Sequence, residues 1–83
     1  MLIQGMKPLM NGSGYLNVVA NSIGELTLKV LDTQGRFAKR ISTEIEQGFQ
    51  ELCVNLNDLT NGTYVLNAFN GDTFIKSFKF TVE

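Results

Sequence analysis

The residues best placed for acid–base chemistry are Glu44 and Glu46, which stand two positions apart in a segment of alternating polarity. On an extended strand, residues two apart project from the same face, as a paired acid and base require. The chain contains no histidine that could assist them. We expect Gln47-Gly48 to form a hairpin turn directly after them, so solvated charge at a strand end explains both carboxylates without catalysis.

The other reactive side chains also have a structural explanation in the sequence. Asp32 begins a turn, and Asn70-Gly71-Asp72 lacks the repeated carboxylates of a calcium loop. Cys53 is the only cysteine, which excludes an intrachain disulfide and a cysteine metal cluster, and no histidine is present to activate it. No glycine-rich phosphate loop precedes a helix. We therefore predict that the chain is not an enzyme and that it uses no metal or cofactor.

Composition and charge favour one small globular domain. At 83 residues, 43% hydrophobic and 18% charged, the chain is long enough for one core and too short for two. Its scattered charges sum to -1, which offers no basic patch for nucleic acid. No apolar run approaches the roughly 20 residues that cross a bilayer, and the first residues do not resemble a secretory signal. From this we expect either a protein that stays where it is made or a fragment whose signal lies elsewhere.

Alternating polarity, interrupted by Gly, Asn and Thr, predicts strands along the whole chain. Each expected strand has one apolar face, in the sets Leu16, Val18 and Ala20; Leu26, Leu28 and Val30; Leu52, Val54 and Leu56; Tyr64, Leu66 and Ala68; and Phe78, Phe80 and Val82. A further long strand, with room for a bend, is expected from Arg36 to Glu46 around Phe37, Ile41 and Ile45. No window combines helical spacing with a cap and a stop, so we expect no helix of consequence.

Two turns and one irregularity follow from local sequence. In Asp32-Thr33-Gln34-Gly35 the carboxylate can bond the backbone ahead of it, and glycine supports the left-handed conformation that closes a hairpin. Asn70-Gly71 is the dipeptide most favoured in a two-residue hairpin loop. Lys76 falls in phase with the apolar set of the last strand, so we expect a bulge near it or an exposed strand start.

Six or seven short strands in one domain predict an all-β fold, an antiparallel immunoglobulin-like Greek-key β-sandwich. Residues 1–14 are expected to be a short edge strand or a flexible lead-in, since Pro8 removes a ladder donor and is tolerated mainly at sheet edges. Residues 15–83 then form the sandwich. Pairing of two copies, edge to edge or face to face, is left open by the sequence.

Aromatic side chains are the remaining candidates for a binding surface. They are Tyr64 and six phenylalanines, Phe37, Phe49, Phe69, Phe74, Phe78 and Phe80. We expect most of them to be in the core, because a small domain needs several large side chains to fill its interior. Phe69 and Phe74 flank the Asn-Gly turn, so we expect them to face each other on the outer side of the hairpin as an exposed apolar spot.

Three elements together carry a resemblance to a known family. They are Leu28-Lys29-Val30-Leu31-Asp32-Thr33-Gln34-Gly35-Arg36, then Leu56-Asn57-Asp58-Leu59-Thr60-Asn61-Gly62-Thr63-Tyr64-Val65-Leu66, and finally Lys76-Ser77-Phe78-Lys79-Phe80. In this order and spacing they resemble the C-terminal sorting domain of the type IX secretion system of the Bacteroidetes, over about Tyr15 to Glu83. This chain and the family share three features. They are a strand that ends in an Asp turn closed by Gly, a Leu-x-x-Gly-x-Tyr element, and a lysine-bearing last strand.

The resemblance implies a function and a location. It implies a seven-stranded, non-catalytic targeting module carried last on a covalently attached passenger protein. Its partners would be the outer-membrane secretion machinery and a sortase-like peptidase that attaches the passenger to surface lipopolysaccharide. The precursor would pass through the periplasm and the outer membrane to the cell surface or the medium. The alternative is a stand-alone immunoglobulin-like interaction or adhesion domain that binds protein or glycan.

The resemblance also implies which residues matter. Asp32, Gly35, Gly62 and Tyr64 match its structural motif, in which the glycines fit turn geometry and close backbone approach, and the tyrosine fits a core anchor with a polar tip. Lys76 and Lys79 would be the charges that are recognised. Lysines on an edge strand also discourage aggregation, which is the competing explanation.

Overall fold

A computed structural model describes residues 1–10 and 12–83 of the chain. They form seven strands: β1 (Leu2–Met10), β2 (Ser13–Ala20), β3 (Gly24–Asp32), β4 (Phe37–Ile45), β5 (Gly48–Asn55), β6 (Gly62–Asn70) and β7 (Thr73–Val82). The described residues contain no helix, which confirms the predicted all-β class. Within the predicted 1–14 segment, Asn11 lies outside the described residues, while Ser13 already belongs to β2.

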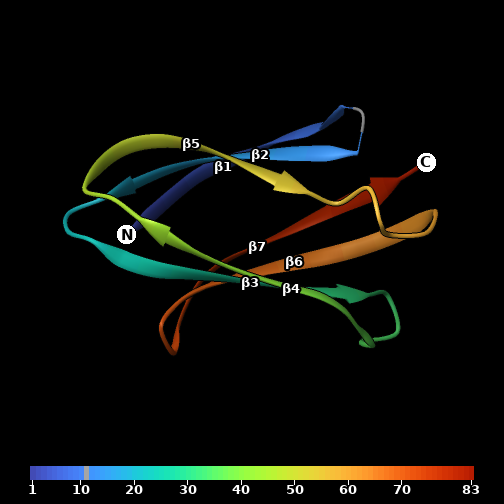
Figure 1. Cartoon of the computed structure of the whole chain (residues 1–83). Coiled ribbons are helices and arrows are strands. Elements are labelled where there is room, and N and C mark those ends of the chain that lie inside the picture. Colours follow the sequence, from blue (N-terminus) through green and yellow to red (C-terminus); the bar gives the residue numbers. More distant parts are fainter. Residues whose placement is uncertain (11) are drawn as a thin grey trace.

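The strands form the two layers of a Greek-key sandwich (Figure 1). One sheet has the order β1-β2-β5 and the other has the order β4-β3-β6-β7, with every pair antiparallel. Two of the pairs, β2 with β5 and β3 with β6, join strands that are not consecutive in the chain. Edge strands β1 and β7 lie near each other across the two layers.

The expected hairpin at Gln47-Gly48 is wrong. β4 pairs with β3 and β5 pairs with β2, so this connection carries the chain from one sheet to the other. Glu44 and Glu46 therefore stand beside a crossover between layers. Local turn residues predict a reversal of the chain, but they do not determine which strand the next segment joins.

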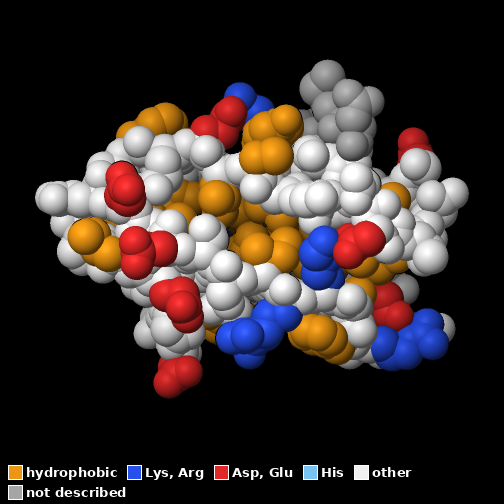
Figure 2. Space-filling view, in the orientation of Figure 1, with side chains coloured by type: hydrophobic (Ala, Val, Ile, Leu, Met, Phe, Trp, Pro, Cys, Tyr) orange, Lys and Arg blue, Asp and Glu red, His pale blue; other side chains and the backbone are white. Residues whose placement is uncertain are grey.

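The interior is built from the alternating apolar faces predicted from the sequence. Its buried members are Ile3, Leu16, Val18, Ala20, Leu26, Leu28, Val30, Ile45, Val54, Leu56, Tyr64, Leu66, Ala68 and Phe80. In Figure 2, hydrophobic side chains are visible between the two layers and at several separate places on the surface. Ile3 contributes to this core from β1, so the first strand is packed into the sandwich.

The expectation that most aromatic side chains are in the core is wrong. Only Tyr64 and Phe80 are buried, whereas Phe37, Phe49 and Phe74 are 60%, 67% and 54% exposed. Leu, Ile and Val already fill the space between two sheets of this size, and they pack compactly on a pleated surface. Phe37, Phe49 and Phe74 are left to the outer faces, whereas Phe78 is half-buried against the core.

Bulges in the two edge strands of the larger sheet change which side chains point inward. In β4, Val30 pairs with Lys39 and Leu31 pairs with Phe37, so the extra residue turns Phe37 to the outer face. In β7, Ala68 pairs with Lys76 and Phe69 pairs with Phe74. The extra residue is Ile75, directly before Lys76, which confirms the predicted bulge near that position. Ile75 packs against the core, and Lys76 remains exposed.

The β6–β7 hairpin confirms the predicted reversal at Asn70-Gly71, with a shift of one residue. Asn70 pairs with Thr73, which leaves Gly71-Asp72 as the two loop residues. Gly71 has φ of +58°, a conformation that glycine adopts at little cost.

Candidate functional site

The motif of Asp32 is a hairpin closed by its own carboxylate. Asp32 Oδ1 accepts hydrogen bonds from the backbone N–H groups of Gln34 and Arg36, each at 2.9 Å. Its Oδ2 accepts a third from Arg36 Nε at 2.7 Å. The backbone N–H of Gly35 donates to the Asp32 carbonyl at 3.0 Å, and Gly35 has φ of +80°, which a side chain would oppose. The turn joins β3 to the edge strand β4.

These bonds stabilise the ionised carboxylate. The backbone N–H of Arg36 is the largest cause that holds the pKa of Asp32 below its ordinary value of 3.8, with further contributions from the guanidinium and from Gln34. A group whose pKa is lower in the folded state contributes stability above its unfolded pKa and loses that contribution as the pH falls through the folded value. The Asp32 turn is therefore most stabilising above about pH 4.

We expect the substitution Asp32→Asn to lower the melting temperature at pH 7 and to make the melting temperature fall less steeply between about pH 5 and pH 2. Asparagine keeps the shape but cannot accept the same charge-assisted bonds. The measurement is thermal unfolding followed by circular dichroism across this range. Asp72→Asn, in an exposed turn with no side-chain hydrogen bond to described residues, is the matched control. Equal acid sensitivity of the Asp32 variant and the unchanged protein would contradict the prediction.

The second motif, Leu59-x-x-Gly62-x-Tyr64, is a tyrosine corner. Tyr64 lies three positions into β6, and its hydroxyl donates to the backbone carbonyl of Thr60 at 2.6 Å, with the Thr60 hydroxyl 3.2 Å away. Such a bond from a buried tyrosine back to the chain just upstream fixes the corner where the chain crosses between the sheets of an immunoglobulin-like sandwich. Gly62 has φ of +154°, and a Cβ added there would stay 3.8 Å from the Tyr64 ring. The backbone conformation at this position, and not a close contact with another part of the chain, therefore explains why residue 62 is a glycine.

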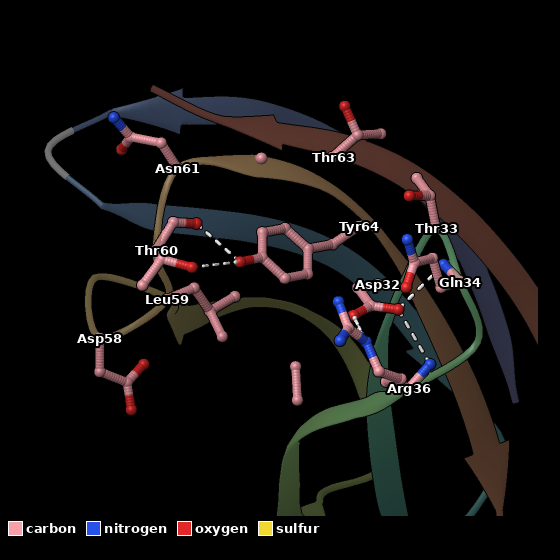
Figure 3. A pocket seen from close by; sticks show the side chains of 12 residues that line it. Asp32, Thr33, Gln34, Arg36, Asp58, Leu59, Thr60, Asn61, Thr63 and Tyr64 are labelled. Atoms are coloured by element: carbon pink, nitrogen blue, oxygen red, sulfur yellow. Dashed lines mark hydrogen bonds and ion pairs between the residues drawn. The ribbon is translucent and has the colours of Figure 1, made fainter.

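Figure 3 shows the two motifs at the same end of the sandwich, on either side of a shallow pocket of about 430 Å³. Asp32 and Tyr64 are direct partners in the β3–β6 ladder, so the long-range pairing brings the motifs together. The Tyr64 ring also stacks on Phe80 of β7 at 5.6 Å between ring centres. Asp58 lines the far side of the pocket.

A lysine anchors the loop that carries the corner. Lys39 Nζ donates to the Asn55 carbonyl and to Asp58 Oδ1, both at 2.8 Å. The side-chain hydrogen bond from Lys39 is the largest cause that lowers the pKa of Asp58. Lys39 lies on the inward-facing row of β4, so it ties an edge of the larger sheet to the β5–β6 connection.

Sequence reasoning did not identify this lysine or a second close contact at the same end. The carbonyl of Gly12 accepts a hydrogen bond from the Leu56 N–H at 2.8 Å. A Cβ added at Gly12 would overlap Cβ of Asn57 and stand 3.0 Å from its Cα. Gly12 is therefore the glycine at which two backbones approach closely, and only the pairing of β2 with β5 makes that visible.

The charged side chains around the pocket form ion pairs with their neighbours. Asp32 and Asp58 are each neutralised by a neighbouring cation, Arg36 or Lys39. The described residues contain no group of three side chains suited to hold a metal ion. They also contain no helix able to cross a membrane.

Neither of the two catalytic candidates from the sequence lines the pocket. Glu44 is exposed and lies opposite Glu25 in the β3–β4 ladder. Glu46 follows the end of β4, and its backbone is tied to Gln50, whose amide donates to the Glu46 carbonyl at 2.7 Å. Cys53 is exposed on β5.

Lys76 and Lys79 lie apart from the pocket, on the edge strand β7. Lys79 is paired with Val65 near the middle of the sheet, and Lys76 with Ala68 toward the other end. Both side chains are exposed, and the Lys76 ammonium stands 5.5 Å from the centre of the Phe78 ring. Being three residues apart on a strand, the two lysines point to opposite faces of it.

The aromatic pair predicted at the β6–β7 turn is present. Phe69 and Phe74 are direct partners in the ladder, with ring centres 5.6 Å apart and planes at 69°. The ammonium of Lys29 lies 4.8 Å above the Phe69 ring. This confirms an apolar spot on the outer side of the hairpin, in which Phe74 is exposed and Phe69 is half-buried.

The fold and the corner define an immunoglobulin-like β-sandwich with seven strands and a tyrosine corner. Within that class, residues 12–83 match the family described as the secretion system C-terminal sorting domain, and the chain belongs to this family. It is a C-terminal sorting signal of the type IX secretion system, and such a domain directs a larger precursor through the cell envelope to the surface or the medium. No curated protein matches the chain.

Proposed function

We propose that the type IX machinery recognises this module through the β7 edge, with Lys76 and Lys79 as the charges it contacts. The observation that carries the proposal is the family match through Glu83 together with the position of β7 at the edge of the larger sheet. An edge strand presents unpaired backbone groups that can pair with another chain. Exposed lysines on both of its faces would add charge complementarity to that pairing.

We expect the double substitution Lys76→Ala/Lys79→Ala to reduce export by about tenfold or more, because two charges would be lost from the recognised edge. The test fuses the domain to the end of a reporter that carries its own signal for the inner membrane, in a host with the type IX system. Secreted and retained reporter are then measured. Deleting Lys76 to Glu83 is a poorer test, because it also removes the core side chain Phe80.

The matched control is Lys7→Ala/Arg40→Ala, which removes the same charge from other strands. Export unchanged by the Lys76/Lys79 variant, with folding intact by circular dichroism, would reject these lysines as recognised groups. An equal loss in the control would show that overall charge matters, and would also reject a specific role for the β7 edge.

We further propose that a sortase-like peptidase removes the module after export and attaches the passenger to surface lipopolysaccharide. A tag placed after Glu83 is then expected to be absent from the exported reporter, while the reporter itself stays on the cell surface. A surface reporter that still carries the tag would contradict removal of the module. A tag-free reporter found wholly in the medium would contradict attachment.

A stand-alone role in interaction or adhesion is a second candidate, favoured by the exposed Phe74, which pairs with Phe69 beside Lys29. Under this alternative, the isolated domain would bind a surface protein or glycan and the reporter fusion would remain in the periplasm. Export of the reporter that depends on the domain would favour the sorting role instead.

A further inference from the structure

The outer face of the four-stranded sheet carries an ordered charge pattern that the sorting role does not use. Along the β3–β4 ladder, Lys29 stands opposite Arg40, and Glu25 stands opposite Glu44. All four side chains are exposed, and no ion pair joins any of them to another described residue. Like charges directly opposite each other destabilise a sheet, so the pattern has a local cost within the single molecule.

An uncharged row separates the two charged pairs. It runs across the whole sheet through Ser42, Thr27, Phe69 and Phe74, which are successive ladder partners. Thr27 is only 5% exposed, although it belongs to the outer face, and its hydroxyl is 3.4 Å from that of Ser42. Phe74 is 54% exposed at the end of the row. The basic pair lies two residues to one side of this row, and the acidic pair lies two residues to the other.

We infer that this face binds a second copy of the chain about a two-fold axis that runs along the Ser42–Thr27–Phe69–Phe74 row. Such an axis reverses the strand direction, so each position on one side of the row meets the position equally far on the other side. Lys29 of each copy then faces Glu25 of its partner, and Arg40 faces Glu44. Two like-charge pairs within one molecule become four opposite-charge contacts between two molecules.

Apolar contact would contribute the rest of the interface. The Phe69–Phe74 row would pack on its own counterpart, in the arrangement of two stacked sheets about 10 Å apart. Phe69 and Phe74 lie close to the β6–β7 turn, so the overlap of the two copies is centred on that end of the sheet.

A different partner with an acidic surface would use the basic pair alone and leave Glu25 and Glu44 facing like charge or solvent. The equal spacing of both pairs from the central row favours the self-association of two identical faces. This inference goes beyond the sorting function and does not rest on it, because it concerns the isolated domain in solution.

The test is sedimentation velocity of the purified domain from about 5 to 500 μM, at low and at high salt. We expect a monomer–dimer equilibrium that weakens with salt. Glu25→Lys/Glu44→Lys and Lys29→Glu/Arg40→Glu are each expected to weaken the dimer by about tenfold or more, because both create like-charge contacts. The four-fold exchange that combines them is expected to restore the dimer, and an equimolar mixture of the two double variants is expected to form a heterodimer.

Glu51→Lys/Glu83→Lys makes the same charge change away from this face and is the matched control, expected to leave the dimer intact. Circular dichroism of each variant verifies its fold. A wild-type domain that stays monomeric at 500 μM and low salt would overturn the inference. So would a dimer that survives in both double variants, or a four-fold exchange that leaves the protein monomeric.

Discussion

Replacing Phe80 with alanine is expected to lower the free energy of unfolding by about 3 to 5 kcal/mol. Phe80 is 9% exposed, lies in the core cluster and stacks on Tyr64 with ring planes at 22°. A domain of this length has a total stability of about 4 to 12 kcal/mol, so the loss would consume a large share of it. Urea unfolding followed by circular dichroism measures the change.

The matched control is Phe74→Ala, the same substitution on the same strand. Phe74 is 54% exposed and its ring pairs with that of Phe69, so we expect a loss below about 1 kcal/mol. The comparison is made at low protein concentration, where any self-association through this face is absent. Similar losses for the two variants would show that Phe80 does not pack β7 into the core.

This comparison also separates folding from recognition on one strand. Phe80 lies on the inner face of β7, whereas Lys79 next to it points outward. Loss of export in the Phe80 variant should accompany loss of the fold, but loss of export in the lysine variant should leave the fold intact. On this strand the packing of Phe80 and the proposed role of the exposed lysines can therefore be separated by mutation.

Local alternation of polarity was sufficient to predict strands β2 to β7, whereas β1 was expected only as a short edge strand or a flexible lead-in. A side chain on a strand alternates faces with a period of two, so Leu16, Val18 and Ala20 had to share a face wherever that strand was placed. The Asp32 and Asn70-Gly71 turns were also predictable, because their geometry depends on residues within four positions of one another.

Local sequence did not predict which strands pair with each other. It also did not predict to which side of the sheet the residues beside a bulge point. Gln47-Gly48 has the composition of a hairpin turn, but β5 pairs with β2 and not with β4. A single extra residue before Lys39 reverses the side of the sheet to which Phe37 points. Both outcomes depend on contacts with segments far away in sequence.

In the candidate site, too, the local features were predictable from the sequence and the long-range contacts were not. The residue types around Asp32 and Tyr64 suggested a turn and a core anchor, and their resemblance to a family suggested that they belong together. That they are direct ladder partners follows only from the β3–β6 pairing. Lys39 gave no signal in the sequence, because a lysine on an alternating strand is indistinguishable from a solvated one until its partner Asp58 is placed.

The Tyr64→Phe substitution tests the corner that this pairing assembles. It removes one hydroxyl and leaves the ring on Phe80, so we expect a loss of about 1 to 2 kcal/mol, or a decrease in melting temperature of roughly 5 to 15 °C. Thr60 is exposed, and water can replace the lost bond at its carbonyl, which keeps the loss below that of a fully buried acceptor.

Tyr15→Phe is the internal control for that experiment, since Tyr15 is the other tyrosine of the chain and its hydroxyl makes no hydrogen bond to described residues. Its loss is expected to stay within about 0.5 kcal/mol, as for a surface substitution away from special features. If the two variants are equally stable, the hydroxyl of Tyr64 does not stabilise the corner. The Leu-x-x-Gly-x-Tyr element would then have to serve as a surface that a partner contacts. If only the Tyr64 variant is weakened, the element serves first to join the two sheets, and the lysines of β7 are left as the part of the motif free to meet a partner.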